Sequence, residues 1–229
     1  MKKAEVYELL EDKMLRYSDL ASQAVVPSGE PMVGVLETPN LSVKPIDPDM
    51  AKFTGNEIYV RKSVAERLGE ASLTLTSFNA DYRLQIVYGY RALSIQTAKY
   101  QKIKQGLTDE YADMELMEAV HRMVAVPEVA GHPTGGAVDV QIAQGGKLLN
   151  FGTKILEFVP DTYTFSPFID REAWFNRQLL RRCMTSSGFA PFDGEWWHFS
   201  YGDKEWATFY NQPNAVYEQI EFSSLQNTL

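Results

Sequence analysis

A histidine and an aspartate stand seven positions apart in a glycine-containing segment near the middle of the chain. The segment reads Ala130-Gly-His-Pro-Thr-Gly-Gly-Ala-Val-Asp139, with His132 before a pair of glycines and Asp139 after it. Because Gly135 and Gly136 allow the backbone to fold back, the two side chains can meet at one point, as metal ligands must. A glycine turn with a surface histidine and a capping aspartate is the alternative interpretation.

A second segment places a carboxylate three residues before an imidazole, among large aromatic side chains. It reads Gly194-Glu-Trp-Trp-His-Phe-Ser200 and contains Glu195 and His198. Side chains three apart on a regular strand point to opposite faces, so the chain must bend here if the two groups act together, with Gly194 as a pivot. An aromatic strand with an edge glutamate and a hydrogen-bonded histidine is the alternative.

Taken together, the two segments supply the ligand set of a catalytic metal site. His132, Asp139 and His198 offer two imidazole nitrogens and one carboxylate. Three protein ligands with an open position are typical of catalytic zinc, whereas structural zinc is usually closed by four ligands. Glu195 is then a fourth group that can stand beside the open position.

Composition limits the class of protein around this site. The 229 residues carry a net charge of −8 and are 45% hydrophobic and 12% aromatic, which predicts a soluble chain with one sizeable core and a single domain over residues 1–229. The only cysteine, Cys183, excludes an intramolecular disulfide and a multi-cysteine zinc site. The densest basic cluster, Arg177 with Arg181 and Arg182, is expected to be a solvated helix face, so no nucleic acid partner is expected.

No uncharged apolar run reaches the roughly 20 residues that a membrane-spanning helix needs, so no membrane association is expected. The N-terminal segment has acids where a signal peptide requires an apolar core, and we therefore expect a cytoplasmic protein. Nothing in the composition determines the oligomeric state.

Apolar residues at helical spacing predict the helices that surround the candidate site. The first is expected to form an N-terminal helix, within residues 1–25, that packs on the domain. Asp109 and Asp170 are expected to cap two others, and His121 is expected to be exposed or capping inside a helix, away from the metal. The predicted helices are 3–24, 63–73, 93–107, 109–124 and 170–187.

Strands are predicted between these helices, and residues 26–56 are predicted to be loop or short extended pieces. On the strand that begins at Ala137, Asp139 shares a face with Gln141. Alternation also predicts one inward and one outward ring for Trp196 and Trp197. Because helices and strands are mixed without regular alternation, the predicted class is α+β. The other predicted strands are 83–88, 195–201 and 215–222.

The pattern H-x-x-G-x-A-x-D, followed later by E-W-W-H, resembles the zinc motifs of the D-alanyl-D-alanine dipeptidases. These belong to the peptidoglycan-directed zinc D,D-peptidases, which include the VanX-type enzymes of vancomycin resistance. Val87-Tyr-Gly-Tyr-Arg91 resembles the family's D-G-Y-R-P stretch, and residues 54–59 and 63–68 are similar to its N-terminal part. The resemblance covers residues 30 to 205 and implies a mostly antiparallel sheet flanked by helices, as in Hedgehog and D,D-peptidase domains.

The resemblance also implies roles for individual residues. One Zn²⁺ per chain would be held by His132, Asp139 and His198, with Glu195 as the catalytic base and Arg91 stabilising the transition state. The reaction would be hydrolysis of D-alanyl-D-alanine, or a related D-amino dipeptide, by water activated on the metal. For Arg91, a surface ion pair after a strand is the alternative.

The sequence departs from the family pattern at several positions near the site. Ala130 stands where the family usually has serine, and Leu156 stands where an acid holds the amino group of the dipeptide, with Glu157 next in line. Tyr88 and Ala92 flank Arg91 in place of Asp and Pro. These differences give weight to a second activity, a D,D-carboxypeptidase acting on peptidoglycan-derived stem peptides. A non-catalytic zinc-binding module, as in Hedgehog signalling domains, is the alternative from another class.

Overall fold

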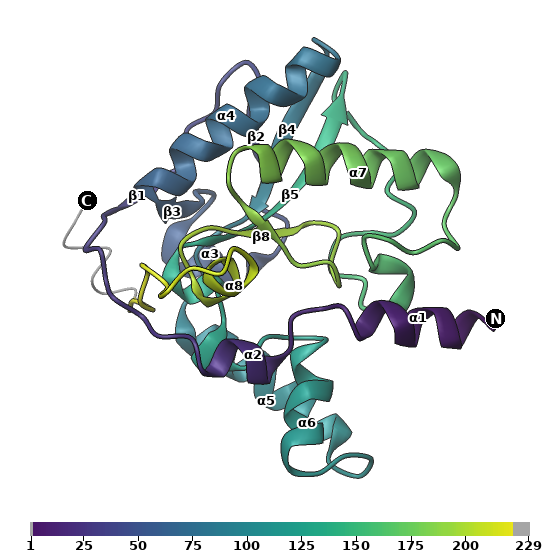
Figure 1. The fold of residues 1–229 in the computed structure, drawn as a ribbon. Helices are drawn as coiled ribbons and strands as arrows, with labels where there is room; N and C mark the ends of the chain where they lie inside the picture. Colours follow the sequence, from purple (N-terminus) through teal and green to yellow (C-terminus); the bar gives the residue numbers. More distant parts are fainter. Residues whose placement is uncertain (1, 222–229) are drawn as a thin grey trace.

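A mixed β-sheet forms the centre of the molecule (Figure 1). In the computed structural model, which describes residues 2–221, six strands form this sheet in the order β2-β4-β5-β8-β7, with β6 paired to β5. Strand β2 runs parallel to β4, and the remaining pairings in the sheet are antiparallel. The predicted α+β class with a mostly antiparallel sheet is therefore confirmed. The strands are β1 Met32–Gly34, β2 Leu41–Val43, β3 Tyr59–Arg61, β4 Tyr82–Tyr88, β5 Ala137–Gln144, β6 Lys147–Leu148, β7 Ala190–Pro191 and β8 His198–Ser200.

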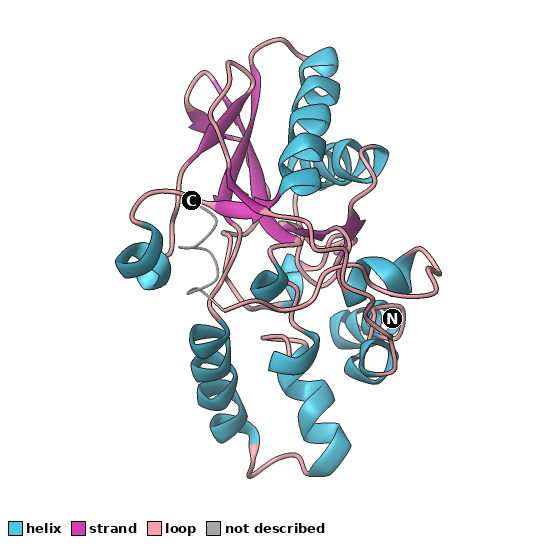
Figure 2. Cartoon of the chain, turned by 90° about the vertical axis from the view of Figure 1, so that its left-hand side faces the viewer, coloured by secondary structure: helices cyan, strands magenta, loops and turns pink. Residues whose placement is uncertain are grey.

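Helices cover the sheet unevenly. Helices α4 and α7 lie side by side against one face, while α5 and α6 project beyond the end of the sheet (Figures 1 and 2). Among the helices that the structure describes, none is both long and apolar enough to span a membrane. The helices are α1 Lys3–Glu11, α2 Tyr17–Ala21, α3 Ala51–Thr54, α4 Lys62–Phe78, α5 Leu93–Leu107, α6 Asp113–His121, α7 Arg171–Ser186 and α8 Lys204–Phe209. Short 3₁₀ turns lie at Pro48–Met50, Pro127–Val129, His132–Thr134 and Pro160–Thr162.

Strand β5 separates the apolar core from the candidate site. Val138, Val140 and Ile142 are fully buried and belong to the core between the sheet and helices α4 and α7. Because side chains alternate along a strand, Asp139 and Gln141 project from the opposite face. The predicted common face of the polar residues on this strand thus lies on the side of the sheet away from the main core.

The N-terminal residues form two helices, so the prediction of one helix over 3–24 was wrong. Helix α1 buries Tyr7 against Phe168, whereas α2 buries Tyr17 beside His121. One straight helix cannot reach both neighbours. The second helix starts at Tyr17 because the Glu118 carboxylate accepts hydrogen bonds from the backbone N–H groups in the first turn of α2. The N-terminal sequence alone cannot indicate this contact, because Glu118 lies far along the chain.

Helix boundaries elsewhere are close to the predictions, with one wrong cap. Helix α5 has the predicted limits, and Asp170 caps α7 by accepting from the Ala173 backbone N–H at 2.8 Å. Asp109, however, lies in the turn that closes α5, where the N–H groups of residues 110 and 111 bond to the Leu107 carbonyl. Helix α6 therefore begins later, with Ala112 at its N-cap position. Helix α4 continues past the predicted end at residue 73.

Two of the predicted strands are shorter or missing. Only His198–Ser200 of the predicted strand 195–201 pairs with the sheet, because the preceding residues form a turn. Residues 215–221 form no strand beyond an isolated bridge from Ala215 to Val25, and Phe222 lies outside the described residues. The absence of regular alternation at Trp196 and Trp197 explains why both rings are buried, contrary to the prediction of one inward and one outward ring.

Arg177 is fully buried, so its prediction as part of a solvated face was wrong. Its Nε and Nη1 donate to the carbonyls of Phe151 and Asp161, each at 2.8 Å, and Nη1 also donates to Tyr163. The guanidinium donates to backbone carbonyls of a segment that is irregular apart from the 3₁₀ turn Pro160–Thr162. A charge pattern on a helix cannot reveal such contacts. Arg177 therefore holds residues 151–163 against helix α7.

We expect Arg177→Met to destabilise the protein strongly. Three buried or partly buried carbonyls would lose their donor, and each such loss costs about 1–3 kcal/mol. The free energy of unfolding should fall by about 3 kcal/mol or more, which lowers Tm by roughly 6–12 °C for a chain of this size. Arg182→Met, at an exposed position of the same helix, should change Tm little. Equal Tm values for the two variants would contradict this assignment.

Candidate active site

Three neighbouring strands bring the candidate residues into one row. Asp139 on β5 is the direct cross-strand partner of His198 on β8, and on its other side it pairs with Tyr88 at the end of β4. Directly opposed side chains on antiparallel strands lie close together. The register of the sheet, and not the sequence spacing, therefore sets His198 beside Asp139.

His132 reaches the same point from the turn before β5. The 3₁₀ turn His132–Thr134 ends at Gly135, whose positive φ of 74° is a conformation that glycine adopts without strain. The His132 Nδ1 lies 2.8 Å from the carbonyl oxygen of Gly89, so Nδ1 carries the proton that it donates. In the neutral ring, Nε2 then keeps a lone pair that can bind a metal ion. A Cβ at Gly89 would lie 2.7 Å from the backbone oxygen of Tyr59, so the close approach of Gly89 to strand β3 requires glycine at this position.

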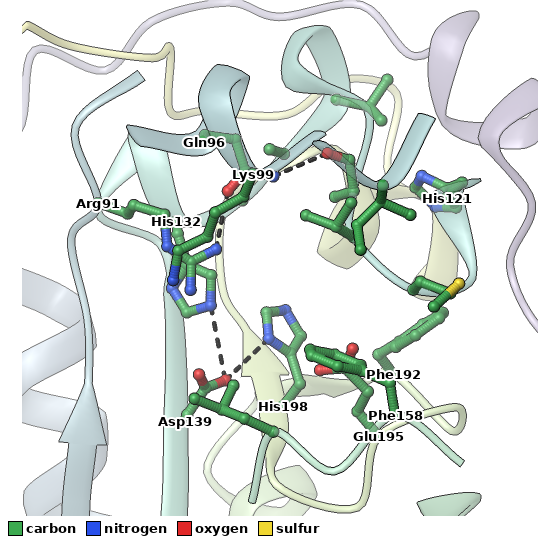
Figure 3. Close-up of a pocket in the computed structure, with 18 of the residues that line it drawn as sticks. Arg91, Gln96, Lys99, His121, His132, Asp139, Phe158, Phe192, Glu195 and His198 are labelled. Carbon is green, nitrogen blue, oxygen red and sulfur yellow. Dashed lines mark hydrogen bonds and ion pairs between the residues drawn. The ribbon is translucent and has the colours of Figure 1, made fainter. Parts of the chain in front are cut away.

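The predicted ligand atoms lie in one buried cluster. Asp139 Oδ1 is 3.0 Å from His198 Nδ1 and 3.5 Å from His132 Nε2, and all three ligand atoms lie within 4.8 Å of one another (Figure 3). Burial would raise the pKa of Asp139, yet the two imidazoles hold it below its usual range. Burial lowers the pKa of His132 to about 4, which keeps that ring neutral.

The charges around His198 fit a bound cation. Burial opposes a positive charge on this ring, but the hydrogen bond to Asp139 and the charges of Glu205 and Glu195 raise its pKa to about 10. Two imidazoles and a carboxylate are a donor set that suits a divalent metal such as zinc. The residues present therefore fit a metal ion.

Glu195 lines the same pocket as these three residues. The backbone N–H of His198 donates to the Glu195 carbonyl at 3.0 Å, forming the bend that the sequence required if the two groups were to act together. Burial, aided by the nearby Asp139 charge, raises the pKa of Glu195 to about 7. A carboxyl group with such a pKa can accept and release a proton near neutral pH.

Arg91 is buried at the wall of the pocket and is not a surface ion pair. Its Nε donates to the Tyr88 hydroxyl at 3.1 Å, and its Nη1 donates to the Gln96 side-chain oxygen at 2.8 Å. Nη2 has no hydrogen-bond partner among residues 2–221 and is not among the buried unsatisfied atoms. One corner of a fixed guanidinium is thus free for a ligand.

The pocket extends from this cluster toward helices α5 and α6 and encloses about 320 Å³ (Figure 3). His121 lines its far side and is buried, so the prediction of an exposed or capping histidine was wrong. The His121 Nδ1 accepts from the Val126 backbone N–H, and burial lowers its pKa to about 4. It does not belong to the cluster of possible metal ligands, as predicted.

Some pocket residues were missed in the sequence. Gln96 holds Arg91 and in turn donates to the Ala125 carbonyl at 2.7 Å. Glu205, in the first turn of α8, faces His198, and burial raises its pKa to about 8. The aspartate cap that begins α8 is visible in the sequence, but nothing there indicates which side chain meets a histidine.

The structure also shows where Leu156 lies, the residue at the position where the family has the acid that holds the amino group of the dipeptide. Leu156 lines the pocket, as does Ala130. Glu157 is exposed outside this pocket, and its carboxylate accepts from the Lys154 backbone N–H at 2.9 Å. The structure therefore gives Glu157 no place as a substitute for that acid.

Residues 50–220 match the Peptidase M15 family, described as D-Ala-D-Ala dipeptidase. The chain belongs to this family. D-Ala-D-Ala dipeptidases of this type are metal-dependent peptidases, and the protein is accordingly a metallopeptidase. The resemblance identified from the sequence motifs is confirmed, and the alternative of a non-catalytic binding module is not supported.

Similar proteins carry the same description. A D-alanyl-D-alanine dipeptidase of Synechocystis is 30% identical over 224 residues, covering 85% of this chain and 91% of that protein. One of Enterococcus faecalis is 28% identical over 182 residues, covering 75% of this chain and 86% of that protein.

Two solved structures also align with the chain. The LD-carboxypeptidase LdcB, described with its peptidoglycan recognition, aligns with a TM-score of 0.43 and 18% identity, covering 89% of this chain and 80% of that one. The vancomycin-resistance D,D-dipeptidase VanXYg, in complex with a D-Ala-D-Ala phosphinate analogue, aligns with a TM-score of 0.39 and 19% identity. That alignment covers 93% of this chain and 74% of the other.

Proposed function

We propose that the protein is a zinc-dependent dipeptidase that hydrolyses D-alanyl-D-alanine or a related D-amino dipeptide. The observation that carries the proposal is the buried cluster of His132, Asp139 and His198 at the wall of a pocket that also contains Glu195 and Arg91. Family membership supports the reaction class, and the donor set supports zinc.

Different residues of the pocket have different roles in the proposed hydrolysis. His132, Asp139 and His198 would hold the zinc ion, which would supply Lewis-acid chemistry and lower the pKa of a water molecule toward neutral. Glu195 accepts a proton from the attacking water and delivers it to the departing amine, which its raised pKa permits. Arg91 cannot lose its charge, so its free Nη2 stabilises the negative oxygen that develops on the former carbonyl.

The test is release of free alanine by the purified protein. We expect release from D-Ala-D-Ala, loss of release after chelation and recovery on addition of about one equivalent of zinc per chain. L-Ala-L-Ala serves as the control and should not be cleaved. A zinc-loaded protein that cleaves neither dipeptide would contradict the dipeptidase proposal.

A second candidate is a D,D-carboxypeptidase that acts on longer peptidoglycan-derived peptides. The observation that favours it is that an apolar side chain lines the pocket at the position where the family's acid holds the substrate ammonium group. Leu156 stands at the expected place, and Asp47, also at the pocket, pairs with Lys99 at 2.6 Å. A buried ammonium without a paired carboxylate is costly. Faster cleavage of an N-acylated D,D-peptide than of the free dipeptide would favour this candidate.

We expect Arg91→Lys to lower kcat/KM by about 10²-fold or more while leaving the zinc content unchanged. Lysine lacks the fork that is held by Tyr88 and Gln96, so it cannot present a second donor at the same place. Steady-state kinetics and metal analysis check both parts. Arg83→Lys, on strand β4, which precedes Arg91 in the chain, lies outside the pocket; it is the control and should keep the parent rate. A fully active Arg91→Lys enzyme would refute the role.

A further inference from the structure

The two histidines of the cluster face Asp139 through different ring nitrogens. His132 uses Nε2, and its Nδ1 is hydrogen-bonded to the carbonyl of Gly89. His198 uses Nδ1, which leaves Nε2 pointing away from the cluster. A neutral imidazole can bind a metal through one nitrogen only while the other carries the proton, so each ring needs an acceptor on its outer side. For His132 that acceptor is a backbone carbonyl.

For His198 the group on the outer side is Glu205. The Glu205 Oε2 lies 3.8 Å from His198 Nε2, which is within ion-pair range and slightly beyond a hydrogen bond. The side chains of both residues are only 12% exposed. The Glu205 Oε1 is buried and has no hydrogen-bond partner among the described residues. A carboxylate that is largely removed from solvent lowers the stability of the fold unless it is paired, and His198 is the partner that it faces here.

A role in starting helix α8 does not explain this placement. An acidic residue in the first turn of a helix is favourable, and Asp203 caps α8 as Asp170 caps α7. Glu172 holds the equivalent position of α7, two residues after the cap, and it is exposed to solvent. An acidic residue stabilises the helix start even when it is exposed, yet the Glu205 side chain is only 12% exposed and lies beside the histidine.

We infer that Glu205 is a positioning residue, which accepts the Nε2 proton of His198 and thereby keeps the Nδ1 lone pair directed at the metal. This inference rests on the proposed zinc site and adds to it a residue that contacts one of the proposed ligands. Removing such an outer partner typically weakens metal affinity by about 10- to 100-fold. Glu205 is therefore expected to act on the metal through His198 without touching the substrate.

The experiment measures zinc affinity of the full-length protein by competition with a chromophoric chelator, independently of turnover. We expect Glu205→Leu to weaken zinc binding by about 10- to 100-fold and Glu205→Gln, which keeps an acceptor oxygen, to recover part of that loss. The matched control is Glu172→Leu, which removes a glutamate from the same helix position without a histidine partner. It should bind zinc like the parent.

Thermal unfolding of the metal-free proteins separates positioning from a structural role. If Glu205 is a positioning residue, the metal-free Glu205→Gln variant, which keeps the side-chain volume and an acceptor oxygen, should be as stable as the metal-free parent. Parent-like zinc affinity in Glu205→Leu would overturn the inference, as would an affinity loss matched by Glu172→Leu. A parent protein that binds zinc tightly but cleaves no D,D-peptide would refute the proposed function alone, since zinc affinity is measured separately.

Discussion

The Glu195→Gln variant is expected to bind one zinc per chain like the parent and to lose most of its turnover. Glutamine has nearly the same shape but cannot accept the proton of the attacking water. Loss of a general base commonly lowers kcat by about 10²- to 10⁴-fold. Metal analysis and alanine release from D-Ala-D-Ala measure the two properties separately. A variant that lost its zinc would show instead that Glu195 is a ligand.

The pH dependence gives a second signature of the same base. Burial raises the pKa of Glu195 to about 7, and a bound cation lowers it. Since only the deprotonated form accepts a proton, kcat/KM of the parent should fall on the acidic side of that pKa by tenfold per pH unit. The residual rate of Glu195→Gln should lack this dependence. The control, Glu66→Gln on the exposed side of α4, should retain the parent profile.

The second large effect is expected for His198→Ala, which removes one of the three proposed ligands. Removing a residue that only hydrogen-bonds to a metal ligand weakens metal affinity by at most roughly 100-fold. Removing a ligand itself should weaken zinc affinity more than that, and activity should disappear at equimolar zinc. The variant also leaves Asp139 with one imidazole in place of two. Chelator competition and thermal unfolding of the metal-free protein measure these effects.

His121→Asn is the control for the histidine substitution. His121 lines the same pocket and is buried, but it lies outside the ligand cluster. The asparagine oxygen can still accept from the Val126 backbone N–H, so the local structure should persist. This variant should keep one zinc per chain. Zinc loss in His121→Asn equal to that in His198→Ala would contradict the proposed ligand set.

The candidate site could be predicted because residue types and short sequence spacings indicate its chemistry. His132 and Asp139 flank a glycine pair, and Glu195 precedes His198 by three residues. With only three histidines and one cysteine in the chain, few ligand sets are possible. The strand that carries Asp139 was predicted from alternation, and the structure places its apolar and polar side chains on opposite faces as expected.

The errors occurred where distant segments decide the environment of a residue. His121 and Arg177 both lie on polar-looking helices, and both are buried by segments far away in the sequence. The break between α1 and α2 depends on the carboxylate of Glu118, about one hundred positions later. Periodicity within one element cannot report such contacts, because it describes only the face of that element and not its neighbour.

By itself, the sequence indicated the candidate ligand types and the α+β composition of the protein, since residue chemistry and local periodicity are properties of short segments. The reaction class followed from the resemblance of its motifs to a known family. Only the tertiary structure decided that β5 and β8 pair in a register that sets Asp139 opposite His198. It also decided that Glu205 faces the outer nitrogen of that histidine. Strand register and helix docking arise from the packing of the whole core, and a shift of one residue would turn Asp139 into that core.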